Sequence, residues 1–408
     1  MGLQRLLAYL FLLKMANNIE AFNPQLWSAR IQKRREKLLV SKPVSSFEEQ
    51  ANLTHGARVH RPTAPEFLTN DYNKYGNGVS IQEVKSEDQY LDVDKVKEVS
   101  FYIDAVEDKQ SKYDAEAEAV KSAVYSISQE MDYTRFKETI NAADYADAAT
   151  AGGSAGTPYT PAVSTLTEFI ENSKAKLRLS GAEQDREWYL VATPKMVSYI
   201  AQSFIKDGFN LADSGLRNGY KGDAYGLKVY ESTNLLHEIQ VTLDTVATTN
   251  TLVVGGVTFT MKSSALTPTA GEVLVGADDA ATAANIVLAI NGGEDEGTKY
   301  SAISTANRAK LRKLGVYASV DASGVVHIYA NGPFTVTGTA NRFVVGSLVA
   351  HCELGRKGAV DMVVQIDPKV QKNKVPNKTG YNFIIYDLYG VKTFDEGKYR
   401  MLDLRVAG

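Results

Sequence analysis

The sequence predicts an α+β protein whose body carries one long helix and several strands, with a block of different composition inserted into it. Apolar residues recur at helical spacing through residues 113–131. Short apolar runs bounded by Gly, Pro and Asn, which are typical of strands, occur before and after this helix. Residues 239–346 are enriched in Thr, Val, Ala and Gly, which indicates a separate module.

Composition and charge exclude several classes of protein. The 408 residues include 45 Lys and Arg against 48 Asp and Glu, and the net charge of −3 does not favour tight binding to nucleic acid or membranes. Cys352 is the one cysteine, which excludes an internal disulfide and a metal site built from several cysteines. The 22 tyrosines against two tryptophans favour extensive contact surfaces, because tyrosine offers stiff apolar area with a polar tip.

The first fourteen residues, MGLQRLLAYLFLLK, differ from everything after them. The apolar run from Leu6 to Leu13 is too short to span a bilayer. Three interpretations stay open: a signal-peptide core without a small-residue cleavage site after it, an extension ahead of a start at Met15, or an apolar arm that docks on another surface. The cluster RIQKRREK at 30–37 is interpreted as the solvated face of a short helix in preference to a nucleic-acid contact.

From Gly56 to Asp104 the chain is predicted to make a long extended excursion. GARVHRP, VSIQEV and KVKEVSFYI have the character of strands, and the turn residues TNDYNKYGNG separate the halves. An isolated two-stranded ribbon is only marginally stable in water, and these strands have charges on both sides. The ribbon must therefore lie against another surface, and the neighbouring sequence offers none.

The clearest helix follows this excursion. Ser111 and Asp114 resemble a capping box. Apolar residues then recur every three or four positions at Tyr113, Ala117, Val120, Val124, Ile127 and Met131. They form one face over about five turns if the helix continues to Ile140. The stripe is too short for a coiled coil, so we expect a helix that lies across a sheet.

The middle of the chain predicts an α+β layer. Residues 147–161, DAATAGGSAGTPYTP, have the composition of a linker, and a helix at about 163–179 follows. WYLVA at 188–192 is expected to be a buried strand. Thr193 can cap the next helix, with Pro194 at its first position and Gly208 at its end. The apolar face of that helix is formed by Met196, Ile200 and Phe204.

Residues 239–346 are predicted to form a β-β-α-β-β module inserted into an interrupted domain. TLVVGGVTFTM indicates a hairpin on Gly255 and Gly256, and VYASVDASGVVHIYA indicates another. DDAATAANIVLAINGG predicts a helix with Asp at its start and Asn-Gly at its end. After the module we expect a helix at about 350–358 and then strands with a turn at Tyr389-Gly390.

One pattern invites a catalytic interpretation. Gly152-Gly153-Ser154-Ala155-Gly156 matches G-x-S-x-G, the motif that exposes a nucleophilic serine between a strand and a helix. The residues before Ser154 are NAADYADAAT and those after it contain two prolines, so neither flank fits. A flexible linker is the preferred interpretation.

Metal ligands and other nucleophiles are equally poorly supported. His55 and His60 lie five apart without a third ligand nearby. Adjacent His351 and Cys352 on a helix would point in different directions, so a buried or interface pair is expected. The acids Asp92, Asp94 and Glu98 lack the glycine of a calcium loop. We therefore predict no catalytic residue, no metal, no cofactor and no enzymatic activity.

The order of the elements resembles that of a major capsid protein of tailed bacteriophages. FNPQLWSARI and EVSFYIDAVEDKQSKYDAEAEAVKSAVYSISQEMD, a strand running into a long helix, carry the first part of the resemblance. REWYLVATPKMVSYIAQSF, NGYKGDAYGLKVYESTNL and YGVKTF carry the rest. No single stretch is diagnostic, and the order and spacing together make the case. The inserted module falls outside the resemblance, although it looks similar to accessory domains of phage structural proteins.

The resemblance implies a tailed-phage major capsid fold with an N-terminal arm, an extended β-hairpin loop, a long spine helix, peripheral and axial domains, and the inserted α+β module. The implied boundaries are 1–50 for the arm, 51–104 for the extended β-loop, 105–159 for the spine helix and peripheral domain, 160–238 for the axial domain, 239–346 for the module, 347–374 for the return of the axial domain and 375–408 for the peripheral strands. Candidate contacts between subunits are Trp27, Tyr72, Tyr75, Tyr220 and Tyr225.

The implied function is a major capsid protein that self-assembles into pentamers and hexamers of an icosahedral head shell around double-stranded phage DNA, contacted non-specifically. The other implied partners are a separate scaffolding protein, a portal and possible decoration proteins, with no membrane. The implied locations are the virion and, during assembly, the host cytoplasm. Two alternatives stay open: an encapsulin-like bacterial nanocompartment shell of the same fold, and a hydrolase that uses Ser154. No crosslink from a lysine of the extended loop is predicted.

Overall fold

The computed structural model describes residues 36–52, 56–64, 67–72, 79, 81–84, 86, 88–106, 115–181, 187–206, 220–268, 270–376 and 378–408. The predictions for the first fourteen residues, Trp27, Tyr75, the cap at Ser111 and the helix end at Gly208 lie outside these ranges. Within the described ranges, no helix is both long and apolar enough to cross a membrane.

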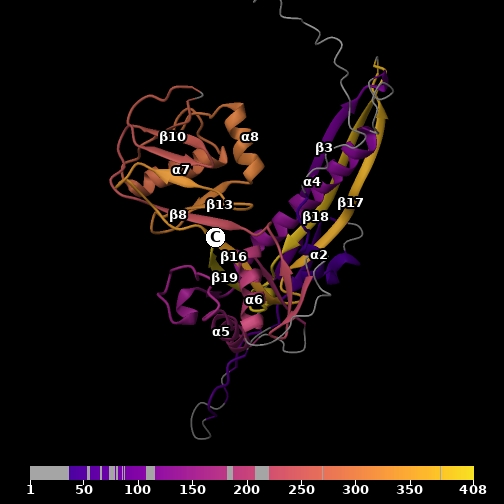
Figure 1. The fold of residues 1–408 in the computed structure, drawn as a ribbon, viewed down its shortest axis with the longest axis vertical. Coiled ribbons are helices and arrows are strands. Elements are labelled where there is room, and N and C mark those ends of the chain that lie inside the picture. Colours follow the sequence, from indigo (N-terminus) through magenta and orange to yellow (C-terminus); the bar gives the residue numbers. More distant parts are fainter. Residues whose placement is uncertain are drawn as a thin grey trace, which may run out of the picture.

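One helix and three long strands form a layer that we call the peripheral layer, visible as the elongated part of Figure 1. Helix α4 (Ala115–Lys137) lies on a sheet of order β17–β18–β3. The strands are β3 (Lys95–Ile103), β17 (Asp361–Lys374) and β18 (Tyr381–Lys392). Ala123 and Ile127 of α4 are buried against Ile385 of β18. The prediction of a helix across a sheet is confirmed, and a 3₁₀ turn, η3 (Glu138–Asn141), follows α4.

A two-stranded antiparallel ribbon precedes the peripheral layer. It consists of β1 (Arg58–Pro62) and β2 (Asp88–Asp92). The prediction that KVKEVSFYI belongs to this ribbon is wrong, because β3 pairs with β18 along its whole length. Its inward-facing residues Val99 and Phe101 gain an apolar environment there, which the ribbon lacks. VSIQEV is also not a strand at its described residues 79 and 81–84.

The centre of the body is a ten-stranded sheet of order β12–β13–β8–β16–β5–β7–β6, with β15 beside β8, β19 beside β16 and β4 beside β19. The strands outside the module are β4 (Tyr145–Ala146), β5 (Trp188–Ala192), β6 (Tyr220–Ala224), β7 (Leu227–Glu231), β16 (Val349–Arg356) and β19 (Met401–Ala407). Helices α5 (Leu166–Leu179) and α6 (Pro194–Lys206) share one apolar core with this sheet. The predicted cap is confirmed, since Thr193 Oγ1 accepts a hydrogen bond of 3.4 Å from the Met196 amide.

The helix predicted at about 350–358 is wrong. These residues form β16, and each residue of the strand is buried. A strand that is covered on both faces shows no polar–apolar alternation, so its sequence resembles a buried helix. Strand β16 has β19 along one edge, whereas β8 and β5 share the other edge.

Two implied boundaries also change near the C-terminus. β17 was expected in the axial return at 347–374, but it pairs with β18 in the peripheral layer. β19 was expected among the peripheral strands at 375–408, but it pairs with β16 in the body sheet.

Tyr389 and Gly390, expected in a turn, lie inside β18. Glycine is needed at 390 because a Cβ there would lie 2.4 Å from the Asp92 carbonyl oxygen of the ribbon.

The inserted module has its own apolar core and the two predicted hairpins. Its helices and strands are β8 (His237–Leu243), β9 (Thr251–Val254), β10 (Val257–Lys262), β11 (Glu272–Leu274), α7 (Asp279–Asn291), α8 (Thr305–Leu314), β12 (Tyr317–Val320), β13 (Val326–Ala330), β14 (Val336–Gly338) and β15 (Phe343–Val345). Gly255 and Gly256 have φ values of 55° and 76°, as the predicted tight turn requires. Helix α8 was not predicted. The module is also not a detached unit, because β8 continues into the body sheet through β16.

The segment 147–161 is not a flexible linker. Asp147 caps a 3₁₀ turn, η4 (Ala148–Ala151), by accepting a hydrogen bond of 3.0 Å from the Ala149 amide. Its other carboxylate oxygen accepts one of 2.6 Å from the Gly156 amide. One buried carboxylate therefore organises the loop. The short remaining elements are α2 (Ser41–Val44), η2 (Glu48–Gln50) and α9 (Asp395–Lys398).

A fully buried ion pair joins the peripheral layer to the body sheet. Arg135 of α4 donates two hydrogen bonds, of 2.7 and 2.8 Å, to the carboxylate of Glu353 on β16. Tyr189 and Thr139 donate to the same carboxylate, and Arg135 also donates to Ser45 Oγ at 3.0 Å. Burial alone would raise the pKa of Glu353, but Arg135 lowers it below its ordinary value. The pair therefore stays ionised with its hydrogen bonds satisfied.

We expect Arg135→Met to lower the free energy of unfolding by about 3–5 kcal/mol at neutral pH, because Glu353 is left buried without its cation. The double variant Arg135→Met, Glu353→Leu should recover most of this loss. Urea denaturation of the full chain measures both. As a matched control, Lys372→Met removes the exposed pair with Glu116 (side chains 41% and 36% exposed) and should cost less than about 1 kcal/mol. Equal losses in the two single variants would contradict the assigned role.

Candidate assembly surface

The ribbon is rooted in the protein by an apolar contact. Leu91 of β2 and Val93 after it are buried together with Val363 of β17 and Phe394. Val59 of β1 packs against the edge of this cluster. The ribbon is therefore attached where β2 crosses β18 at Gly390.

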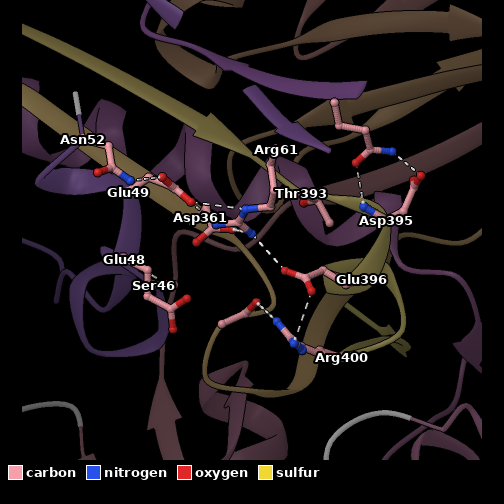
Figure 2. A network of polar contacts seen from close by, with 12 residues as sticks. Ser46, Glu48, Glu49, Asn52, Arg61, Asp361, Thr393, Asp395, Glu396 and Arg400 are labelled. Atoms are coloured by element: carbon pink, nitrogen blue, oxygen red, sulfur yellow. Dashed lines mark hydrogen bonds and ion pairs between the residues drawn. The ribbon is translucent and has the colours of Figure 1, made fainter. Parts of the chain in front are cut away.

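A charged cluster completes the root of the ribbon (Figure 2). Arg61 of β1 forms ion pairs with Glu49 at 2.6 Å and with Asp361 and Glu396, both at 2.9 Å. The guanidinium also lies 4.2 Å from the centre of the Phe394 ring. Hydrogen bonds from Arg61 lower the pKa of Glu49, whereas burial raises the pKa of Asp361. One arginine thus connects the ribbon to η2, β17 and α9.

A second polar contact holds the other strand of the ribbon. Gln89 of β2 accepts a hydrogen bond of 3.0 Å from the Asp395 amide, and its side-chain amide donates to the Asp395 carboxylate. Because β1 and β2 are both tied to α9, the direction in which the ribbon leaves the body is determined. In Figure 1 the indigo segment projects beyond the body at the lower end of the view.

Beyond the root of the ribbon, the segment that connects β1 to β2 exposes large apolar side chains. Leu68 is 80% exposed and Ile81 is 93% exposed. Gln82 ties the two limbs together, since its Oε1 accepts a hydrogen bond of 2.9 Å from the Leu68 amide and its Nε2 donates to the Leu68 carbonyl. The other exposed apolar residues of this segment are Phe67, Tyr72, Val79 and Val84. Six large apolar side chains are thus exposed within one segment of the described chain.

A second exposed surface lies on the peripheral layer. α4 covers one face of the three-stranded sheet, and the residues of β3 alternate between half-buried and exposed. Val96 and Tyr102 of β3 lie on the uncovered face and are exposed. Val370 and Tyr381 are also exposed, but their pairing with Ile385 and Ile103 places them on the side of α4. The chain therefore presents apolar groups at two separate places.

The predicted contact residues differ in their exposure and in whether the structure describes them. Tyr72 lies on the exposed segment of the ribbon. Tyr225 is partly buried in the body, where its hydroxyl is within hydrogen-bond distance of Thr167 and Ser203. Tyr220 belongs to β6, and its side chain lies outside the described part, as do Trp27 and Tyr75. Sequence reasoning missed Phe67, Leu68, Ile81 and Val84 as contact residues; the alternation of VSIQEV was a signal for the last two only.

The residues considered for catalysis and metal binding are not brought together. Ser154 is exposed after the turn η4, without the strand and helix of a nucleophile elbow. Burial raises the pKa of Cys352 to about 12, so this thiol is not an activated nucleophile. No group of three or more His, Cys, Asp and Glu side chains in the described ranges is placed to hold a metal ion.

Comparisons with known proteins agree with this geometry. No family model and no curated protein matches the sequence. A solved chain from Mycobacterium phage Che8 matches with a TM-score of 0.54 at 13% identity, covering 94% of this chain and 96% of that one. The chain has the tailed-phage capsid fold. The capsid structure of cyanophage P-SCSP1u matches at 9% identity with a TM-score of 0.49, covering 95% of this chain and 94% of that one. The capsid of Myoviridae phage XM1 matches at 10% identity with a TM-score of 0.47, covering 95% of this chain and 98% of that one. At these identities the likeness shows the fold alone.

We expect Arg61→Gln to loosen the ribbon of this capsid fold, because Asp361 is buried and would lose its cation. Hydrogen exchange in β1 and β2 should become faster by about tenfold or more while α5 is unchanged. The matched control is Arg58→Gln on the same strand, which removes an exposed ion pair with Asp92 and should leave exchange in the ribbon as it is. Unchanged exchange after Arg61→Gln would show that the apolar contact alone holds the root.

Proposed function

We propose that the chain is a major capsid protein that self-assembles into pentamers and hexamers of an icosahedral shell around double-stranded phage DNA. The observation that carries the proposal is the capsid fold over nearly the whole chain, combined with a rooted ribbon that exposes apolar residues. The nanocompartment alternative is not favoured, because the likeness in fold is to a phage chain.

The geometry of the ribbon supports contacts between copies. Its root is held to η2, β17 and α9, while Leu68 and Ile81 beyond the root are exposed. A second copy offers the uncovered face of the peripheral layer, where Val96 and Tyr102 are exposed. A contact between two different surfaces of identical chains is heterologous, and such contacts close into rings. Pentamers and hexamers are rings of this kind.

The remaining partners belong to the proposal as well. A separate scaffolding protein, a portal and possible decoration proteins would act during assembly in the host cytoplasm, and the finished subunit would reside in the virion. The net charge of −3 favours weak contact with the packaged DNA. Such contact would be non-specific and would weaken steeply with salt.

We expect replacement of residues 64–86 by a short Gly-Ser linker to abolish shells while the subunit stays folded. The replacement spares β1 and β2, because Leu91 belongs to a buried cluster and β3 belongs to the peripheral layer. Negative-stain imaging and light scattering compare this variant with the wild type, each with and without a candidate scaffolding protein. Closed shells from the variant would refute the role of the ribbon.

Two controls make this experiment specific. Val344→Ser removes an apolar side chain of the module that is 59% exposed, and it should leave assembly unchanged. Circular dichroism and thermal melting check that the linker variant keeps its fold. Wild-type shells isolated with double-stranded DNA support the capsid assignment, whereas shells holding only protein would replace it with the nanocompartment function.

A further inference from the structure

The inserted module meets the body along a narrow seam. The body and the module have separate apolar cores, so no shared core holds them together. Strand β8 pairs with β16 at two positions only, Glu238 with Val349 and His237 with Ala350. The His351 amide adds a hydrogen bond of 2.9 Å to the Leu236 carbonyl. What else crosses this seam therefore decides how firmly the module is held.

A buried histidine crosses the seam with a carboxylate on each side. His351 of β16 is 2% exposed, and its Nδ1 lies 3.0 Å from both oxygens of Asp403 on β19. Its Nε2 lies 3.1 Å from Glu238 Oε2 on β8. An ionised carboxylate only accepts hydrogen bonds, so both ring nitrogens must carry a proton. The geometry fits an imidazolium that donates to both carboxylates.

Each of the two carboxylates has a further partner besides His351. Glu238 also contacts Nδ1 of His327 on β13, and Arg405 Nε lies 3.2 Å from Asp403. Burial raises the pKa of Glu238, but hydrogen bonds from His327 and His351 lower it well below its ordinary value. Loss of the proton of His351 would thus leave two buried carboxylates facing a neutral ring, which is costly.

We propose that the imidazolium of His351 is an electrostatic latch that holds the inserted module to the body, and that its deprotonation releases the seam. All the groups involved belong to one chain, so the latch does not depend on assembly of the subunit. The module keeps its own core when the latch opens, and its orientation relative to the body becomes less restricted, with the contact of Lys137 with the Tyr317 ring remaining.

The pH at which the latch opens follows from its surroundings. Burial lowers the pKa of His351, and Asp403 and Glu238 raise it more, to about 9. Since this is above the ordinary value of 6.5, the stabilising contribution is complete below 6.5 and is lost as the pH rises through 9. The hydrogen bond to Glu238 also raises the pKa of His327, so its deprotonation acts in the same direction.

The pKa values of several other groups near His351 lie away from 9. Burial lowers the pKa of His237 to about 4 and raises those of Tyr329 and Cys352 to about 12. The pKa of Tyr317 is raised further by burial. The charged and titratable groups on the face of the sheet shared by His351 are Glu238 of β8, Tyr317 of β12, His327 and Tyr329 of β13, Glu353 of β16 with Arg135 of α4, and Asp403 and Arg405 of β19. His237 and Cys352 lie on the opposite face.

Hydrogen exchange of the full-length protein from pH 7 to pH 10, corrected for the intrinsic rate, tests the proposal. In the wild type we expect the amides of the seam, above all the His351 amide that donates to Leu236, to lose protection by about tenfold or more near pH 9. The rest of β8, which stays paired with β13 and β15, should stay protected, as should β9, β10 and α5. In His351→Gln the seam amides should exchange fast already at pH 7 and show no step near pH 9. A wild type with constant protection, or the same step in His351→Gln, would overturn the latch.

Two further variants keep the test valid if His351→Gln does not fold or if another group titrates near pH 9. The double variant His351→Gln, Glu238→Gln removes the cation together with one of its carboxylates, so it should keep the seam protected without a step near pH 9. It carries the pH test if the single variant does not fold. His60→Gln is the matched control, because it removes an exposed His–Asp pair with Asp88 and should leave the seam unchanged. A step near pH 9 that persists in the double variant would assign the titration to another group.

Discussion

The buried ion pair between Arg135 and Glu353 is the constraint on which the rest of the structure depends. It connects α4 of the peripheral layer to β16, the strand that also joins β19, β5 and β8. His351 lies two residues before Glu353, so both side chains leave the same face of the strand. One residue is tied to the helix and the other to the module. Three parts of the molecule are therefore oriented from a single strand.

The parts are stabilised and connected by different forces. The body, the module and the peripheral layer each bury a separate apolar cluster, and apolar burial has little directional preference. The joints carry charge: Arg135 with Glu353, His351 with two carboxylates, and Arg61 with three. A buried ion pair adds little net stability but penalises every arrangement in which a charge loses its partner. The apolar cores alone would tolerate several relative orientations of the parts. The charged joints therefore select one of these orientations.

The sequence predicted elements wherever local signals are sufficient. The apolar stripe of α4, the turn at Gly255-Gly256 and the start of α6 at Pro194 involve neighbours a few residues apart. β16 was missed because a strand buried on both faces lacks alternation, and its charged residues find partners far away in the chain. β3 was assigned to the wrong partner for the same reason, since β18 lies at the other end of the sequence. Of the candidate contact residues, Tyr72 lies on the exposed segment, whereas the more exposed Ile81 carried only the alternation of VSIQEV, which predicted a strand.

The root of the ribbon affects the free-energy balance of the proposed shell. Every contact between copies must offset the entropy lost when the contacting groups become ordered. The ion pairs of Arg61 with Glu49, Asp361 and Glu396 set the direction of the ribbon within the free subunit, so part of that entropy is already lost before assembly. Each contact can then be modest in strength and still favour a closed shell, because many identical contacts add up. A charged root within one subunit thus strengthens an apolar interface at a distance.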